Sequence, residues 1–214
     1  MSELLLVNPN TSEAITRLLQ EHVQRELGPA FAVRAVTARF GAPYIADEAS
    51  YAVAAHAVLD AWQAQARADA VLIGCFGDPG LFALRESSGA PVTGLAEAAF
   101  AEAAQHGSFA VVTGGTRWEA MLWRLAQALG FDGVLAGVHT VVPSGAELAA
   151  DPEAARALLA RACEEAAERF DARAVIVGGA ALAGMAAELQ PHCGLPLIDS
   201  VAAGARRIAA ALQP

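Results

Sequence analysis

The sequence predicts an α/β protein made of two similar parallel-sheet halves, related by a pseudo-two-fold axis, with the active site in the cleft between them. Short runs of aliphatic and β-branched residues alternate along the chain with longer stretches rich in Ala, Leu, Arg and Glu. This order is typical of parallel strands joined by helices, which cover both faces of each sheet in three layers. The chain has 214 residues, 55% of them hydrophobic, which is enough for one large core or two smaller ones.

An internal similarity favours two cores. Three pairs of segments recur in the same order at a nearly constant offset of about 105 residues. The pairs are 68–75 with 172–179, 90–94 with 195–199, and 6–8 with 111–113. We therefore expect a first half at residues 1–106 and a second half at 107–214, with the chain crossing back near its ends. Ligands of open α/β sheets bind at the carboxyl ends of the strands, which here would line the shared cleft.

The expected elements follow from these patterns in chain order. Strands are predicted at 4–7, 31–37, 70–73, 92–93, 109–113, 133–142, 174–177 and 197–198. Helices are predicted at 12–27, 50–66, 80–87, 95–106, 117–129 and 151–169, with a last one ending near 212. Asp78 and Pro79 have the residue types of an N-cap and a first helical residue, which predicts a helix starting there.

Composition excludes several classes of protein. A net charge of −9 argues against a nucleic-acid binder, and no apolar run reaches the roughly 18 residues that span a membrane. All 14 basic residues are Arg, so a Schiff-base lysine is excluded. No Cys and His spacing suits zinc, and three scattered cysteines without a signal peptide suit a reducing compartment. We expect a cytoplasmic protein without metal or cofactor that binds a small molecule and can form homo-oligomers.

Three loops follow strands and would meet in the cleft. The first contains Asn8, Asn10 and Thr11, and the third, at the mirrored position, begins Thr113-Gly114. Amide and hydroxyl side chains with free backbone N–H groups can hold a carbonyl or carboxylate oxygen. The alternative is structural, because the same residue types cap helices and make turns.

The second loop carries Cys75 at the carboxyl end of its strand. Nearby N–H groups and a helix dipole can stabilise a thiolate there, so we expect Cys75 to be alkylated faster than Cys163 or Cys193. The alternative is a small buried cysteine that fills a tight corner. Cys163 lies within a predicted helix, and Cys193 precedes the last strand at its amino end, away from the cleft.

These loops resemble those of the aspartate/glutamate/hydantoin racemase superfamily, in particular its hydantoin-racemase-like branch. The similarity covers nearly the whole chain and rests on residues 8–12 (NPNTS), 75–81 (CFGDPGL), 91–94 (PVTG) with Glu97, and 196–199 (PLID). It implies an isomerase that needs no cofactor and moves a proton at a carbon α to a carbonyl, with one cysteine from each half flanking that carbon.

The resemblance assigns roles to residues of this chain. Cys75 corresponds to the thiol of the first half. The residues expected to bind substrate are Asn8, Asn10, Thr11, Tyr44, Phe76, Thr113, Gly114 and Ala180. The Phe76 N–H and the loop hydroxyls would hold the enolate oxygen, and Tyr44 and the Phe76 ring would give the pocket an apolar side.

The chain departs from the pattern where the second thiol belongs, because the mirror position of Cys75 is Gly179. Three functions stay open at this point. One is a hydantoin- or amino-acid-type racemase in which another loop residue or water serves the second face. Another is a single-thiol decarboxylase or lyase of the same superfamily, and the third is a non-catalytic protein that binds a small metabolite. We expect a racemase or isomerase, because it fits the hydantoin-racemase-like branch, and the intact Cys75 loop argues against a non-catalytic protein.

Overall fold

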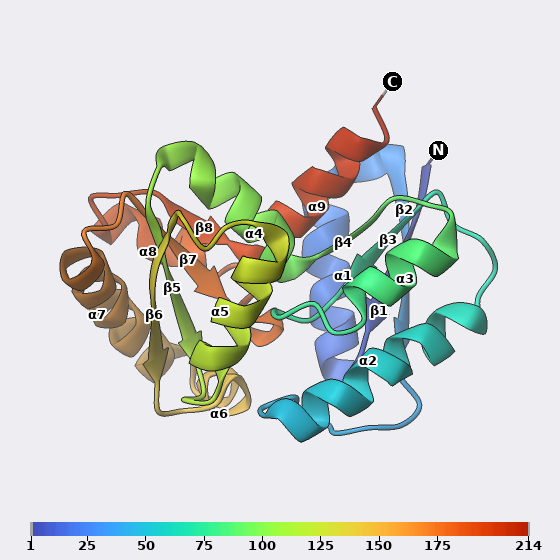
Figure 1. The fold of residues 1–214 in the computed structure, drawn as a ribbon, viewed down its shortest axis with the longest axis horizontal. Coiled ribbons are helices and arrows are strands. Elements are labelled where there is room, and N and C mark those ends of the chain that lie inside the picture. The colour runs from blue at the N-terminus through green and yellow to red at the C-terminus, as the bar shows by residue number, and fades with distance from the viewer. Residues whose placement is uncertain (1, 214) are drawn as a thin grey trace.

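The computed structural model describes residues 2–213 and contains two four-stranded parallel sheets (Figure 1). The first sheet has the order β2-β1-β3-β4 and the second has the order β6-β5-β7-β8. The strands are β1 (Ser2–Asn8), β2 (Phe31–Thr37), β3 (Ala70–Ile73), β4 (Val92–Gly94), β5 (Phe109–Gly114), β6 (Leu135–Val141), β7 (Ala174–Gly178) and β8 (Leu197–Asp199). The predicted fold class, with two similar halves, is confirmed.

Helices cover both sheets (Figure 1). They are α1 (Glu13–Leu27), α2 (Glu48–Gln63), α3 (Leu81–Ser88), α4 (Leu95–Ala103), α5 (Trp118–Leu129), α6 (Gly145–Ala150), α7 (Pro152–Phe170), α8 (Met185–Leu189) and α9 (Ser200–Ala211). Single 3₁₀ turns lie at Gly28–Ala30, Ala104–His106, Ala180–Leu182 and Gln190–His192. The sequence did not predict α6 and α8, because helices of 6 and 5 residues are too short to show a helical period.

The two sheets repeat the same pairing. In the first, Leu4–Val7 of the central strand β1 lies in register with Ala70–Ile73, and in the second, Phe109–Val112 of β5 lies in register with Ala174–Val177. These strands are almost completely buried because helices cover both faces, which explains their continuous apolar runs. The carboxyl ends of both sheets consequently point into the space between them.

The helix that follows the last strand of each sheet packs against the other sheet. Helix α4 contacts β7 and β8, while α9 contacts α1, α4 and the strands β3 and β4 (Figure 1). Phe100 of α4 is fully buried against Phe109 and Phe131, and its ring also meets Phe76 edge-on. One continuous core therefore joins the sheets, and the division of the chain at residue 106 stays a prediction.

Each crossing helix begins at a carboxylate, but the two carboxylates come from different places. Asp78, in the loop after β3, accepts hydrogen bonds from the α4 N–H groups of Ala96 (2.9 Å) and Glu97 (2.7 Å). Asp199, at the end of β8, accepts from Val201 N–H (2.9 Å) at the start of α9. The expectation that Asp78 caps its own helix is wrong, because α3 begins at Leu81 and the Asp78 side chain turns away to α4.

In the described part of the chain, no helix is both long enough and apolar enough to cross a membrane.

Gly94→Ala is expected to lower the free energy of unfolding by about 2–3 kcal/mol, because the new Cβ would overlap the carboxyl of Asp78 and displace the cap of α4. Urea unfolding measures the change. Gly133→Ala is the matched control, since nothing lies within 4 Å of its Cβ position, and its effect should stay within about 0.5 kcal/mol. Equal stability of the two variants would contradict this account of the cap.

Candidate active site

A small cavity lies where the strand ends of both sheets meet. It is lined by Asn10, Tyr44, Ile45, Cys75, Phe76, Thr113, Trp118, Gly179 and Ala180. Seven of these nine residues were predicted from the sequence as site residues; Ile45 and Trp118 were not. Trp118 could have been found from its position in the chain, because a large aromatic residue at the start of a helix directly follows the third loop. The internal duplication predicts that the loops after these strands meet, and in the structure they line one cavity.

Three predicted binding residues do not line the cavity but build the loops around it. The Asn8 side chain is fully buried, and its amide group donates to Asn10 Oδ1 (2.9 Å) and Thr16 Oγ1 (2.9 Å). The backbone N–H of Thr11 donates to Ala42 O (3.1 Å), which fixes the first loop against the segment that carries Tyr44. Gly114 lets the segment before α6 approach, since a Cβ there would lie 2.7 Å from Pro143 O. Direct substrate binding by Asn8, Thr11 and Gly114 stays a prediction.

Cys75 sits at the carboxyl end of β3 with 7% of its surface exposed. Burial raises the pKa of its thiol well above the usual value, and the charge of nearby Asp78 raises that pKa further. The expected stabilisation of a thiolate by a helix start is not found, because α3 begins six residues later, at Leu81. Both effects favour the neutral thiol over the thiolate in the closed site.

The loop that carries Cys75 is held from several sides. The backbone N–H of Asp78 donates to Cys75 O (3.2 Å), and the hydroxyl of Tyr51 donates to Gly77 O (2.8 Å). Gly77 has φ of +132°, and the Trp118 ring packs where its Cβ would be. Burial raises the pKa of Asp78 to about 7, although the two α4 N–H groups that donate to its carboxylate lower that pKa. The loop thus has a fixed shape even though it contains glycine.

Gly179, after β7 of the second sheet, lines the same cavity, at the position where the resemblance places a second thiol. Its φ is +153°, a conformation that suits glycine, and Leu182 side-chain atoms lie 3.2 Å from the position of a Cβ. A Gly179→Cys substitution would put a second thiol at this position. The backbone makes that substitution strained, because the loop after β7 does not follow the course of the loop after β3.

Tyr44 reaches from the first sheet's side of the cavity to the second. It lies in the loop between β2 and α2, and its phenol oxygen lies against the backbone of Gly145 at the start of α6. A Cβ at Gly145 would overlap that oxygen, so the contact is tight. Burial raises the pKa of Tyr44 well above its usual value, and the charge of an ionised Cys75 raises that pKa further.

The cavity is closed in this structure. Its free volume is about 30 Å³, room for one or two water molecules, so a substrate enters only after the loops separate. Two ion pairs connect α2 with the α5 segment beside it: Arg117 with Asp47 (3.2 Å), and Arg124 with Glu48 (3.0 Å). Both pairs are exposed and screened by solvent, so they hold the site shut only weakly.

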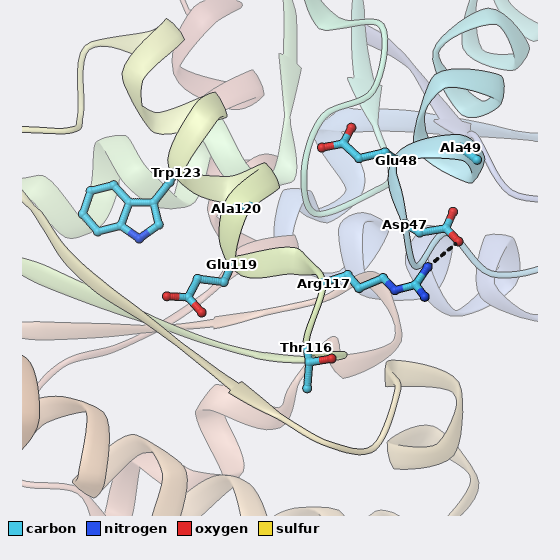
Figure 2. Close-up of a pocket in the computed structure, with 8 residues that line it drawn as sticks. All are labelled: Asp47, Glu48, Ala49, Thr116, Arg117, Glu119, Ala120 and Trp123. Atoms are coloured by element: carbon cyan, nitrogen blue, oxygen red, sulfur yellow. Dashed lines mark hydrogen bonds and ion pairs between the residues drawn. The ribbon is translucent and has the colours of Figure 1, made fainter.

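A larger hollow of about 640 Å³ lies at these ion pairs, outside the cavity (Figure 2). Figure 2 shows Arg117 extended toward Asp47 on one side, with Glu119 and Trp123 of α5 on the other. This hollow has no thiol in its lining, and its Asp47 carboxylate is already paired. We therefore place the candidate active site at the smaller cavity.

The structure reverses the expected order of cysteine alkylation. Cys193 is half-buried, whereas Cys75 is buried, so iodoacetamide should modify Cys193 first and Cys75 more slowly. Peptide mass spectrometry after timed alkylation gives the three rates. Cys163, which is 1% exposed inside α7, is the internal reference for a fully packed thiol. Fastest modification at Cys75 would contradict the closed, neutral-thiol site.

Comparisons with known proteins give the same similarity along nearly the whole chain. The sequence profile of the family described as Asp/Glu/Hydantoin racemase matches residues 4–208. A hydantoin racemase of Paenarthrobacter aurescens is 30% identical over 207 residues, covering 95% of this chain and 88% of that protein. The crystal structure of allantoin racemase from Pseudomonas fluorescens has a TM-score of 0.94 at 28% identity, covering 97% of this chain and 89% of its own. Allantoin racemase from Klebsiella pneumoniae has a TM-score of 0.90 at 29% identity, covering 98% of this chain and 87% of its own.

Proposed function

Because this chain belongs to the Asp/Glu/hydantoin racemase family, we propose that it racemises 5-substituted hydantoins, allantoin among them, with Cys75 as an acid/base group. The family predicted from the loop motifs is confirmed, and so is the expectation of a racemase-type isomerase. The substrate and the role of Cys75 are the new part of the proposal. The names of the relatives support the substrate class, and the cavity supports the residue.

The observation that carries the proposal is the position of Cys75. It is the thiol at the carboxyl end of β3, and it lines a cavity to which loops of both sheets contribute. A thiolate there can remove the proton from a carbon α to a carbonyl, which leaves an enolate. The Phe76 N–H, the Asn10 amide and the Thr113 hydroxyl lie on the same cavity and would donate hydrogen bonds to the enolate oxygen.

Burial of Cys75 has two opposite effects on this chemistry. A raised thiol pKa makes the thiolate a stronger base toward a weak carbon acid, but it also lowers the fraction of enzyme that is ionised at neutral pH. A substrate whose ring proton is comparatively acidic suits such a site. A hydantoin has this property, because the neighbouring carbonyl takes up the charge as an enolate and the acylated ring nitrogen on the same carbon withdraws electrons.

Gly179 favours a second candidate. A site with one thiol can protonate an enolate from one face, so decarboxylation of a substituted malonate needs no thiol at position 179. Release of CO2 from an α-substituted malonate, without racemisation of any hydantoin, would select this function. We favour the racemase, because the relatives that match along the whole chain at 28–30% identity are racemases.

Cys75→Ala is expected to lower the racemisation rate of a 5-substituted hydantoin by about 10²–10⁴-fold, the range for loss of a general acid/base group. Polarimetry with single enantiomers, corrected for racemisation without enzyme, measures the rate. Cys163→Ala is the matched control, since that thiol is buried in α7 away from the cavity. A Cys75→Ala enzyme with the rate of the unchanged protein would disprove the role of this thiol.

The value of kcat/KM is expected to rise with pH from about pH 7 to about pH 9, by nearly tenfold per unit. The reason is that Cys75 has a raised pKa, is protonated in this range and has to lose its proton before it can act as a base. Initial rates in buffers of constant ionic strength give the profile, after subtraction of the rate without enzyme. A flat profile over this range would show that the thiol is already ionised.

A further inference from the structure

The cavity contains a second group that can carry a proton. Among the described residues that line it, Cys75 and Tyr44 are the ones whose side chains exchange a proton in acid/base catalysis. The remaining lining residues carry one amide, one hydroxyl, hydrocarbon and indole side chains, and one is glycine. Two-base racemisation needs a proton acceptor on one face of the carbon and a proton donor on the other, and position 179 supplies neither.

The positions of the two groups suit opposite faces of a substrate. Cys75 lies two residues beyond the end of β3 of the first sheet, while the phenol oxygen of Tyr44 lies against Gly145, just beyond β6 of the second sheet. Gly145 N also lies 2.9 Å from the position of a Cβ on Gly114, at the end of β5. The phenol oxygen is therefore held on the second sheet's side of the cavity, although Tyr44 belongs to a loop of the first.

We propose that Tyr44 is the second acid/base residue, delivering a proton to the face of the substrate carbon opposite Cys75. This inference rests on the proposed racemase function and names the group that replaces the missing thiol. In one direction, the Cys75 thiolate takes the α-proton as the C–H bond breaks and the electron pair moves into the carbonyl. The Tyr44 hydroxyl then gives its proton to the other face, leaving a thiol and a phenolate. The reverse direction starts from that thiol and phenolate.

Electrostatics keeps the two groups in complementary states. An ionised Cys75 raises the pKa of Tyr44, so the site holds one negative charge more easily than two. The Gly145 N–H lowers the pKa of the phenol and so stabilises the phenolate that one direction of the reaction produces. Burial raises the pKa of both groups, which keeps the proton that they share inside the cavity.

The test follows α-proton exchange of each enantiomer separately in D2O, with allantoin and 5-methylhydantoin as probes. The unchanged enzyme should exchange both enantiomers with inversion. Tyr44→Phe should lower racemisation at least about 10²-fold while still exchanging one enantiomer with retention, through Cys75. Cys75→Ala should show the opposite selectivity, exchanging only the other enantiomer, through Tyr44. Proton NMR for exchange and chiral chromatography for configuration give both rates.

Tyr51→Phe is the matched control. The chain has two tyrosines, and Tyr51 is partly buried like Tyr44, but its hydroxyl donates to Gly77 O outside the cavity lining. A weaker loop should change exchange of both enantiomers by the same factor, so their ratio should stay that of the unchanged enzyme. Tyr44→Phe with that same ratio, or with full racemisation, would overturn the role of Tyr44 and leave the proposed racemase intact. Failure of the unchanged enzyme to exchange either probe would overturn both.

Gly145→Ala tests the same role without removing the tyrosine. Its Cβ would overlap the phenol oxygen, so Tyr44 has to move away from its present place. The expected result is a loss of exchange confined to the enantiomer that Tyr44→Phe also fails to exchange. An equal loss for both enantiomers would mean that Tyr44 only shapes the cavity. This variant also serves if Tyr44→Phe does not fold.

Discussion

The bond between the Asp78 carboxylate and the start of α4 is the interaction on which the site depends. It connects the loop that carries Cys75 to a helix that packs on the second sheet, so the thiol has a fixed position relative to both sheets. The same carboxylate is buried beside Cys75, and its charge opposes ionisation of the thiol. The Asp78 carboxylate therefore serves both folding and chemistry. It joins the two sheets, and its charge makes the Cys75 thiolate more basic.

The two sheets repeat one pattern, but their loops have diverged in a coordinated way. Where the first sheet has Gly94 and takes its helix cap from Asp78, the second has Asp199 at the mirrored strand end. The loop after β7 therefore does not have to cap a helix of the other sheet. Within this loop, Gly179 has a positive φ that a cysteine would not favour. A pseudo-symmetric fold therefore holds an asymmetric site, in which a phenol rather than a thiol faces Cys75.

A cavity of about 30 Å³ is consistent with chemistry that excludes water, but the cavity has to open before a substrate can enter. Exposed ion pairs at Asp47 and Glu48 hold the segments beside it together weakly, while the apolar contacts of Phe100 and the cap at Asp78 lie deeper and are strong. Movement of the loop that carries Tyr44 can then admit a substrate without disturbing the core that places Cys75.

The sequence by itself determined the strands, the longer helices, the duplication and the family, because apolar periodicity and loop motifs are local signals. It also placed Cys75, Thr113 and Gly179 at strand ends, since residues that directly follow parallel strands gather at one edge. Only the tertiary structure decided that Asp78 caps α4, that burial raises the pKa of Cys75, and that the Tyr44 oxygen crosses to Gly145. Those outcomes depend on burial and on contacts between segments distant in the chain, which a local sequence pattern does not reveal.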